Sequence, residues 1–580
     1  MTIRRLVTFN HNPLLERGLE GWRARLVLGL ILLGSLALIA RAAWLQGFND
    51  DMLKAQGEQR YTRTLAVPAT RGRITDRNGD VLAVSSPVRA IWAIPQDARL
   101  EPAEARELAE LLGTEVERLN RLLASERPRV YLHRQVSPER ARKIAEMKLA
   151  GIHQDPAYRR FYPVGEVTAH LVGFTNIDEL GQEGMERAFN DVLRGEAGAR
   201  RVIRDNRGRI IEDVELLRAP RDGEDLALSI DNQIQFIAYS ALKQAMQEHR
   251  AKAGSAVVLD VRTGEVLALV NAPTFNPNNR SGLSGTQLRN RALTDLHEPG
   301  STVKPFIAAM AIEAGHVLPD TEVDTDNGRI RIGRAVISDV SDRGMLTVSE
   351  VIQKSSNVGV VKMAMDFEPE PMWELFDSIG MGRRLALDFP GAANGLLRSA
   401  DRWRPIEQAT MSFGHGLSTT LMHMARAYLA FAREGDLLPI SLLRRDAPPT
   451  ESSRIFKPET VYMVREMLER AVGPEGTGQR ASVTGYRVAG KTGTAHKLVD
   501  GQYANKYMAS FIGFAPVSNP RIVVAVMIDE PSAGKHYGGV VAAPVFARIT
   551  EGALRSLGVA PDAPLAPLHL ADGPVAGERM

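Results

Sequence analysis

The sequence predicts an α+β fold in which helices flank one antiparallel sheet, preceded by a non-catalytic stalk domain and one transmembrane helix. Three observations predict this. Two pairs of apolar runs around turn-forming residues are typical of β-hairpins, and they lie at 255–270 and 507–528. The stretches between these hairpins have helical patterning and lie at 301–314, 348–366, 418–433 and 458–471. An uncharged apolar run, Leu26–Ala40, precedes them all. Strands at both ends of a domain around a helical middle indicate a sheet closed by distant segments.

Composition excludes several classes of protein. The 580 residues are enough for several domains, each with its own core. Lys+Arg 72 against Asp+Glu 69 gives a net charge of +3, and without clustering that balance does not indicate nucleic acid as a partner. The chain has no cysteine, which excludes disulfides and thiolate metal sites. This fits an oxidising compartment without proving one.

The N-terminus has the composition of a membrane anchor. Residues 1–25 are rich in arginine, and the apolar run extended to Leu45 supplies the roughly 20 residues that a spanning helix needs. Trp22 and Trp44 flank this run, as interface residues do. The arginine excess predicts a cytoplasmic N-terminus and an exported remainder. A cleaved signal peptide is the alternative, because Ala40-Arg41-Ala42 resembles a cleavage site.

The stretch that follows the anchor reads as a stalk. Residues 61–69 are strand-like, Asn78-Gly79 is a hairpin turn signal, and 101–123 and 137–150 have helical periodicity with many charges. We find no pairing of a nucleophile with a base there, so a structural role is expected. From about 558 the chain is rich in Pro, Ala and Gly without periodicity, which predicts a disordered tail. The expected segments are a cytoplasmic leader, an anchor, the stalk, a catalytic domain and the tail, at 1–25, 26–46, 47–222, 223–557 and 558–580.

A serine and a lysine three residues apart are the first candidates for chemistry. Pro305 lacks an N–H and fits a helix only in its first turn, so the helix begins close to Ser301. Lys304 then lies on the same face as Ser301, whose hydroxyl sits at the positive end of the helix dipole. A serine becomes a useful nucleophile when a neighbouring lysine of lowered pKa takes its proton. Taken alone, the S-x-x-K pattern favours a plainer interpretation, in which Ser301 is a helix cap with a solvated lysine nearby.

Two further motifs lie downstream of Ser301. Ser355 and Asn357 form an S-x-N sequence between two helical stretches, and residues 491–494 read K-T-G-T on a predicted edge strand. Gly490 and Gly493 on that strand are expected to let a substrate backbone lie close. A second S-x-x-K pattern, 532–535, contains a glycine and follows a proline, so we expect a loop there and a chance match.

In the order S-x-x-K, S-x-N and K-T-G, these motifs resemble those of the penicillin-binding proteins and serine β-lactamases. Residues 71–83 resemble the opening box of the class B penicillin-binding proteins, 160–174 and 181–186 their later non-catalytic boxes, and 412–416 another segment of their transpeptidase domain. Nearly the whole chain past the anchor is covered. The resemblance is greatest to the division-specific, FtsI-type members, with the elongation-specific relatives as the alternative. We recognise no glycosyltransferase motif, which a bifunctional class A enzyme needs.

The resemblance implies a penicillin-binding transpeptidase domain and a role for each motif residue. Ser301 would attack the carbonyl between the two terminal D-alanines of a donor stem peptide, and Lys304 would take its proton. Ser355 would pass that proton to the leaving amine, and Asn357 would hold Lys304 and the substrate amide. Lys491 would be the neighbouring cation that lowers the pKa of Lys304.

The same resemblance assigns the substrate-binding strand and the partners. Thr492, Gly493 and Thr494, with Lys491, would receive the donor, and backbone N–H groups of Ser301 and Thr494 would form an oxyanion hole. Serine is also common in the family where this chain has Thr492. The implied substrates are peptidoglycan stem peptides with a D-Ala-D-Ala donor and an amine acceptor, β-lactams would acylate Ser301, and no cofactor or metal is implied. A membrane glycan polymerase and other division proteins are the implied partners of an inner-membrane protein whose catalytic domain is periplasmic.

Functions of other classes stay open at this point. A D,D-carboxypeptidase or β-lactamase would share the three motifs, although we find no E-x-x-L-N stretch between the second and third, as a class A β-lactamase needs. A penicillin sensor needs a cytoplasmic output domain, for which residues 1–25 are too short. A division scaffold that uses residues 47–222 is compatible with catalysis.

Overall fold

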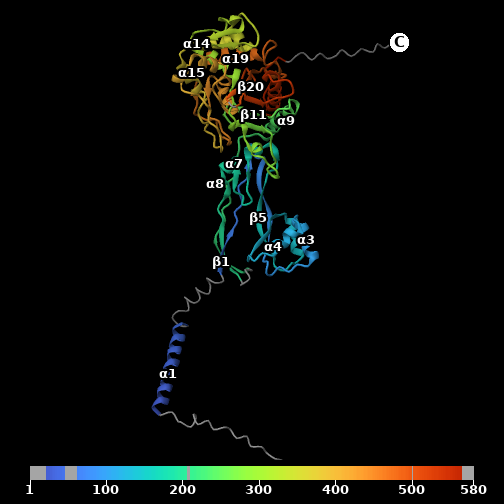
Figure 1. The fold of residues 1–580 in the computed structure, drawn as a ribbon, viewed down its shortest axis with the longest axis vertical. Helices are drawn as coiled ribbons and strands as arrows, with labels where there is room; N and C mark the ends of the chain where they lie inside the picture. The colour runs from blue at the N-terminus through green and yellow to red at the C-terminus, as the bar shows by residue number, and fades with distance from the viewer. Residues whose placement is uncertain (1–20, 46–61, 205–209, 500, 565–580) are drawn as a thin grey trace, which may run out of the picture. The chain divides into compact units, whose positions relative to one another are not determined.

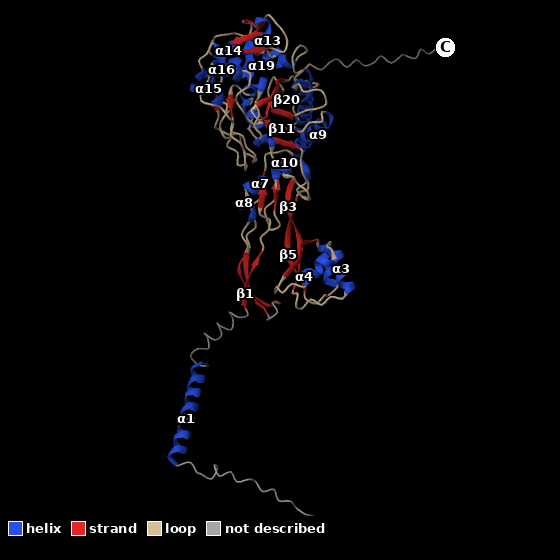
Figure 2. Cartoon of the chain, viewed as in Figure 1, coloured by secondary structure: helices blue, strands red, loops and turns tan. Residues whose placement is uncertain are grey.

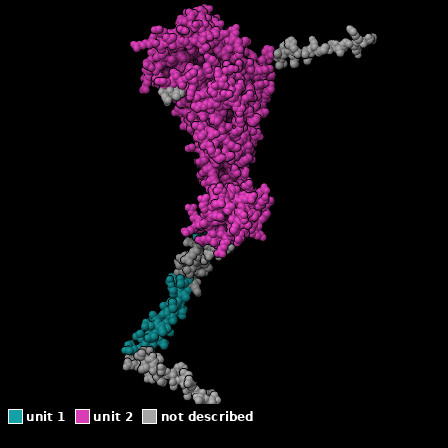
Figure 3. Space-filling view, turned by 45° about the vertical axis from the view of Figure 1, so that its right-hand side comes forward, with its two compact units in different colours: residues 1–69, 196–221 teal, residues 70–195, 222–580 magenta. Residues whose placement is uncertain are grey.

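The computed structural model of the protein describes residues 21–45, 62–204, 210–499 and 501–564 (Figure 1). Contacts divide the chain into two compact units, one of residues 1–69 and 196–221 and one of residues 70–195 and 222–580 (Figure 3). Within the predicted stalk, 47–222, residues 62–69, 196–204 and 210–221 belong to the first unit, whereas residues 70–195 belong to the second. The predicted domain boundaries stay predictions.

The first unit contains the apolar helix and a small sheet. Helix α1 (Gly21–Ala43) is 23 residues long, with a mean hydropathy of 2.3 in its most apolar window, so it is long and apolar enough to cross a membrane. It begins at Gly21, earlier than the predicted Leu26. Strands β1 (Thr62–Val67), β8 (Gly198–Arg204) and β9 (Ile210–Arg218) form an antiparallel sheet in the order β1-β8-β9. The predicted strand at 61–69 is thereby confirmed for its described residues, whereas most of the predicted leader lies outside them.

The second unit begins with a mixed sheet and short helices. Strand β2 (Ile74–Thr75) pairs antiparallel with β3 (Val81–Ala93), which confirms the hairpin at Asn78-Gly79. The sheet order is β10-β2-β3-β4, with β5 also on β3. The other strands and helices of this part are β4 (Val130–Val136), β5 (Ile152–Phe161), β6 (Phe174–Thr175), β7 (Gly181–Glu183), β10 (Leu226–Ala227), α3 (Pro102–Leu112), α4 (Val116–Leu123), α5 (Pro138–Glu146), α6 (Ala169–Val172), α7 (Gly184–Ala188) and α8 (Asn190–Arg194).

Two arginines share one buried carboxylate in this region. Glu186 accepts from Arg71 Nε at 2.7 Å and from Arg160 Nε at 2.6 Å, and all three side chains are at most 2% exposed. A buried charge is tolerated when it is paired, and here one carboxylate joins the chain before β2 to β5 and α7.

The predicted antiparallel sheet is present, and distant segments close it. Its strands run in the order β12-β11-β21-β20-β19, all antiparallel. Figure 2 labels β11 and β20 of this sheet, with α9 and α19 in the same part of the chain. The hairpin β11–β12 lies beside the hairpin β20–β21 because β11 pairs with β21, placing Ala256 opposite Val526. The bounds of the strands are β11 (Ala253–Asp260), β12 (Val266–Ala272), β19 (Ala489–Val499), β20 (Gln502–Ala515) and β21 (Ile522–Asp529).

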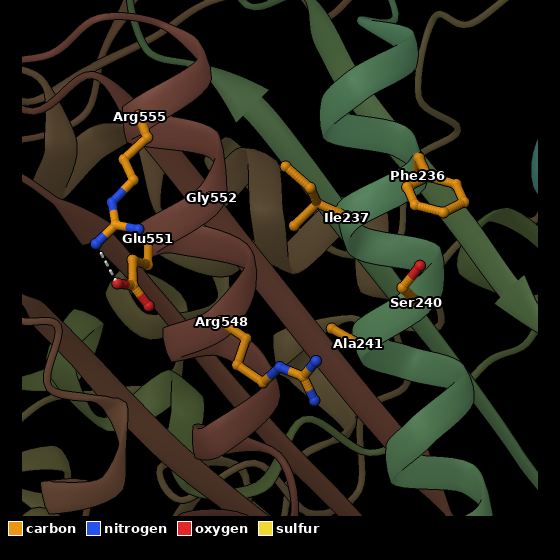
Figure 4. A pocket seen from close by; sticks show the side chains of 8 residues that line it. All are labelled: Phe236, Ile237, Ser240, Ala241, Arg548, Glu551, Gly552 and Arg555. Carbon is orange, nitrogen blue, oxygen red and sulfur yellow. Dashed lines mark hydrogen bonds and ion pairs between the residues drawn. The ribbon is translucent and has the colours of Figure 1, made fainter.

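Both faces of this sheet are buried under helices. Along β11, Val257 and Leu259 belong to one apolar core, whereas Ala256 and Val258 belong to another, as the alternation of side chains in a strand requires. The second core is closed by α9 (Asn232–Glu248) and α21 (Ala543–Ser556). These two helices can lie close together because Gly552 has no side chain. A Cβ at this position would stand only 2.8 Å from the Ile237 side chain (Figure 4).

The helical middle of the domain covers the other face. The four predicted helical stretches are all helical, although two of them are broken into pairs. The helices here are α10 (Gly285–Leu288), α11 (Arg291–Thr294), α12 (Lys304–Glu313), α13 (Val348–Lys354), α14 (Asn357–Met365), α15 (Pro369–Ser378), α16 (Pro405–Met411), α17 (Leu421–Ala427), α18 (Leu429–Ala432) and α19 (Pro458–Val472). Short strand pairs lie among them, at β13 (Glu322–Asp324) with β16 (Met345–Thr347), β14 (Arg329–Ile332) with β15 (Ala335–Ser338), and β17 (Asp436–Leu437) with β18 (Ser453–Arg454). Helix α20 (Gly538–Val541) follows β21, and its Val541 belongs to the core closed by α9 and α21.

The start of the predicted disordered tail is packed against the domain. The Asp562 carboxylate accepts from the backbone N–H groups of Arg487, at 2.7 Å, and Ser518, at 3.1 Å, and Val559 O accepts from the Tyr486 hydroxyl at 2.6 Å. Side-chain and backbone hydrogen bonds thus hold a segment that lacks apolar periodicity. Residues 565–580 lie outside the described part of the chain.

Candidate active site

The turn that carries Ser301 leads directly into a buried helix. Residues Gly300–Val303 form one turn of 3₁₀-helix, and α12 begins at Lys304 with Pro305 in its first turn. Gly300 takes φ +59°, a conformation that favours glycine, and its N–H donates to Gly414 O at 3.1 Å. The predicted helix start is therefore confirmed to within a turn, and Ser301 lies half-buried at its N-terminal end.

Lys304 is fully buried and points at the second motif. Its Nζ donates to Ser355 O at 2.6 Å and to Asn357 Oδ1 at 2.7 Å, and it lies 3.3 Å from Ser355 Oγ. Burial, then the nearby Lys491 cation, lower the pKa of Lys304 well below its usual value, while the Asp339 carboxylate opposes them. The predicted direction of this pKa shift is confirmed.

The second motif is a turn between two helices. Helix α13 ends at Lys354, Ser355 adopts φ +64°, and α14 begins at Asn357. A left-handed conformation is unfavourable for a residue with a side chain, so the surrounding contacts must hold it. One of them is the Asn357 side-chain amide, which donates to Ser338 O at 2.9 Å.

A carboxylate that the sequence did not reveal holds this turn. Asp339 accepts from the backbone N–H groups of Asn357 and Val358, the latter at 3.0 Å, and from Ser356 Oγ at 2.6 Å. It therefore caps the N-terminus of α14, where a negative charge is favoured. Nothing in the local pattern marks Asp339, since it follows β15, 16 positions before Ser355.

The third motif lies on the edge strand β19, as predicted. Lys491 is fully buried, and its Nζ donates to Ser355 Oγ at 2.9 Å. Burial lowers the pKa of Lys491 to about 7. Ser355 Oγ thus lies between two buried amines, Lys304 Nζ and Lys491 Nζ.

The glycines of β19 stand where a side chain would overlap neighbouring protein atoms, and the predicted approach of a substrate along them stays a prediction. A Cβ at Gly493 would stand 2.3 Å from Ser510 Oγ, 3.0 Å from Thr302 Cγ2 and 3.1 Å from Pro299 O. A Cβ at Gly490 would lie 2.7 Å from the Phe511 ring. The missing side chains therefore let β19 pack against the Ser301 turn and within its own sheet.

Two threonine hydroxyls accompany Lys491 along the strand. Thr492 Oγ1 lies 2.9 Å from Thr477 Oγ1, and Thr494 Oγ1 accepts from the Gly538 N–H at 3.0 Å. Because the oxygen of Thr494 is the acceptor in that bond, its own proton is left to donate to a ligand.

A third carboxylate ties the nucleophile turn to its neighbours. Glu298 accepts from Gly416 N at 2.8 Å and from Tyr503 Oη at 3.0 Å, and lies 3.0 Å from His415 Nδ1. Burial raises the pKa of Glu298, but these contacts lower it by more, so the net shift is downward. The segment 412–416 is thereby placed against the turn that carries Ser301, and sequence reasoning assigned no role to Glu298.

The second S-x-x-K pattern is a loop, as predicted. Residues 532–535 have no helical structure and are exposed, and Ser532 Oγ donates to Arg250 O at 2.8 Å. Within the described residues, no group of three or more His, Asp or Glu side chains is arranged to hold a metal ion.

Comparison with known proteins agrees with this geometry. The family model described as the penicillin binding protein transpeptidase domain matches residues 254–551, and the penicillin-binding protein dimerisation domain matches 66–228. A probable peptidoglycan D,D-transpeptidase PenA of Neisseria gonorrhoeae is 45% identical over 91% of both chains. The peptidoglycan D,D-transpeptidase FtsI of Escherichia coli K12 is 43% identical over 93% of both chains. The transpeptidase domain of Burkholderia pseudomallei penicillin-binding protein 3 is 50% identical, with a TM-score of 0.54, covering 58% of this chain and 98% of that one.

The chain therefore belongs to the penicillin-binding protein transpeptidase family. Because a dimerisation domain precedes the transpeptidase domain and both aligned relatives cover nearly the whole chain, it is a class B member of the FtsI and PenA type. This confirms the resemblance drawn from the three motifs.

Proposed function

We propose that the protein is a serine D,D-transpeptidase that cross-links peptidoglycan stem peptides at the division septum through an acyl-enzyme on Ser301. The observation that carries the proposal is the convergence of Lys304 and Lys491 on Ser355 Oγ, next to the Ser301 turn. The division role follows the FtsI name of a relative that this chain matches over 93% of both lengths.

Lys304 is the base in this proposal. Lowering the pKa of Lys304 favours its neutral form, and a neutral amine has two protons and one lone pair. The two shortest contacts of Lys304 Nζ, to Ser355 O and Asn357 Oδ1, use the two protons. The lone pair is then left for the proton of Ser301 or of Ser355.

Ser355 transfers the proton to the leaving amine. Its hydroxyl lies within reach of both amines, so a proton arriving at Lys304 can pass through Ser355 Oγ to the nitrogen of the departing D-alanine. The left-handed backbone of Ser355 places that hydroxyl against Lys304 of α12 and Lys491 of β19.

The edge strand receives the donor peptide. Lys491, Thr492 and Thr494 would bind the terminal carboxylate, and the N–H groups of Ser301 and Thr494 would stabilise the oxyanion, where one such donor is worth about 3 kcal/mol. A bound carboxylate would raise the pKa of Lys491 and so favour its charged form. The acyl-enzyme then reacts with the amine of a neighbouring stem, and a β-lactam would acylate Ser301 in place of the donor.

Covalent labelling by a fluorescent penicillin tests the nucleophile. The full chain should be labelled on Ser301 by mass spectrometry, and Ser301→Ala should abolish the label. Ser532→Ala is the matched control, because it removes the serine of the other S-x-x-K pattern and should label normally. Label retained by Ser301→Ala would refute the proposal.

Release of the label separates a transferase from a hydrolase. A transpeptidase keeps water from the acyl-enzyme and should release penicillin slowly, whereas a β-lactamase or D,D-carboxypeptidase needs a positioned water and should turn it over. Rapid release would favour the hydrolase.

We also propose that α1 is an uncleaved single-pass anchor in the inner membrane, with the N-terminus cytoplasmic and the catalytic domain periplasmic. Its length and apolarity support an anchor, and Arg23 and Arg25 near its start support that orientation. A membrane glycan polymerase and other division proteins are the proposed partners, because cross-linking needs newly made strands.

A further inference from the structure

A cationic cavity lies in the second compact unit, and none of the residues that line it belongs to the three motifs. Its volume is about 330 Å³, within the range of roughly 300–1,000 Å³ that ligand sites occupy. It is lined by the ends of β4, β5 and β6 and by the loop 277–281 that follows β12. We propose that this cavity binds a carboxylate-bearing peptidoglycan strand while its stem peptide is in the catalytic cleft. The inference rests on the proposed function, which supplies that polymer.

The charge of the cavity is positive, and two of its three arginines have no carboxylate partner among the described residues. Of its twelve lining residues three are arginines, Arg159, Arg160 and Arg280, and none is acidic. The Arg159 side chain is exposed and makes no hydrogen bond or ion pair with any residue that the structure describes. Arg280 donates to Thr175 O at 2.8 Å and has no carboxylate partner among the described residues.

Arg160 contributes a buried donor. The residue is 5% exposed and its Nε pairs with Glu186, yet its Nη2 has no hydrogen-bond partner within the described chain. A buried N–H group without a partner costs free energy, so such groups persist where a ligand or water satisfies them.

Three amide side chains of the cavity also have N–H groups that no described acceptor pairs with. The side-chain NH₂ groups of Gln135, Asn176 and Asn279 donate to no described protein group, whereas the Asn176 and Asn279 oxygens already accept backbone or hydroxyl protons. Guanidinium and amide N–H groups together select carboxylates, acetamide carbonyls and hydroxyls. Acetylated sugars and the carboxylates of stem peptides carry those acceptors in one polymer.

A second cavity lacks these properties. The hollow between α9 and α21 is lined by Phe236, Ile237 and two arginines, but Arg555 pairs with Glu551 at 2.7 Å in its own helix (Figure 4). The charge of this hollow is thus partly neutralised within the protein, and three of the four residues that line it from α9 are apolar.

The position of the cationic cavity fits a peptidoglycan strand that continues from the Ser301 site. Asn278 joins its two sides, since its side chain accepts from Tyr162 N at 3.0 Å and donates to Tyr162 O at 2.8 Å. The loop 277–281 therefore holds the β5 region to the same chain segment that leads through α10 and α11 to the Ser301 turn.

Binding of soluble strands to the full chain in detergent tests the inference. The probe is uncross-linked glycan strands that carry stem peptides, and the protein is first acylated with penicillin so that the cleft is filled. Arg159→Ala should raise the dissociation constant for the strands about tenfold, because it removes one charge-assisted hydrogen bond. Arg142→Ala, which removes a 73%-exposed arginine from α5, is the matched control and should bind as the unaltered chain does.

The outcomes separate this inference from the proposed function. Strands whose carboxylates have been amidated should also bind about tenfold more weakly. Equal affinity of Arg159→Ala and Arg142→Ala, or equal affinity for amidated strands, would overturn the inference, as would binding to anionic phospholipid vesicles in preference to strands. The rate of penicillin acylation should be the same in Arg159→Ala as in the unaltered chain, and a chain that penicillin fails to acylate would instead contradict the proposed function.

Discussion

Asp339 offers a sharp test of how the second motif is held. Its carboxylate accepts from two backbone N–H groups through Oδ1 and from Ser356 Oγ through Oδ2. Asparagine can keep all three contacts, because its oxygen still accepts the two N–H groups and its NH₂ can donate to the serine oxygen. Asp339→Asn therefore removes the charge, whereas Asp339→Ala removes the charge and the contacts.

The structure sets the size of each effect. Asp339→Asn loses a charge at the start of α14, worth about 1 kcal/mol of unfolding free energy. Asp339→Ala leaves two N–H groups and a hydroxyl without this acceptor in a partly buried turn, which should cost about 3 kcal/mol. Since that turn places Ser355 and Asn357, we expect Asp339→Ala to slow penicillin acylation about 100-fold, as for a misplaced catalytic group.

The dependence of acylation on pH separates charge from geometry. Asp339 raises the pKa of Lys304, against the larger effects of burial and Lys491, so Asp339→Asn should lower that pKa further. Lys304 must lose its proton to act as a base, so the acid limb of the acylation profile should move to lower pH. Urea unfolding and second-order acylation rates across a pH series measure both effects. An acid limb that stays in place for Asp339→Asn, with an unaltered rate for Asp339→Ala, would refute the role assigned to Asp339.

Two further predictions concern β19. Burial lowers the pKa of Lys491 to about 7 in the folded chain, whereas its ordinary value is about 10.5. Between pH values of about 7 and 10.5 the unfolded chain therefore binds one more proton than the folded chain. The unfolding free energy should rise across this interval by about 1.4 kcal/mol per pH unit. Lys491→Met should lose this slope in urea unfolding at several pH values, and an identical slope would contradict the buried, uncharged amine. Gly493→Ala should cost about 1–3 kcal/mol and slow acylation, because the new methyl group would overlap Ser510 and the Ser301 turn. Gly285→Ala, where a methyl group meets nothing within 4 Å, should leave the unfolding free energy and the acylation rate unaltered. If the two variants had the same stability and the same acylation rate, the close packing of β19 would be contradicted.

Local patterns in the sequence carry much of this architecture. Apolar runs around 262–264 and 516–520 predict two hairpins, and both are present as β11–β12 and β20–β21. Pro305 sets the start of α12 to within one turn, because a residue without an N–H fits only there. The spacing of Ser301 and Lys304 needs no tertiary information, since one helical turn brings them together.

Other features of the site depend on contacts that no local pattern encodes. Asp339 reaches the second motif only because β15 ends beside the start of α14. The neighbours of Gly493 are the Ser301 turn and β20, so close packing is a reason for a glycine there that the sequence did not reveal. The division of the stalk has the same origin, because β1 pairs with β8 across more than a hundred residues.

The amino-acid sequence by itself determined the family, the three motifs and the order of helices and strands, since backbone geometry and side-chain periodicity act over a few residues. Only the tertiary structure decided that Ser355 lies between two buried amines, that burial lowers the pKa of each amine, and where three arginines gather around a cavity. Desolvation and charge–charge interaction depend on which atoms surround a group, and those atoms come from segments far apart in the chain.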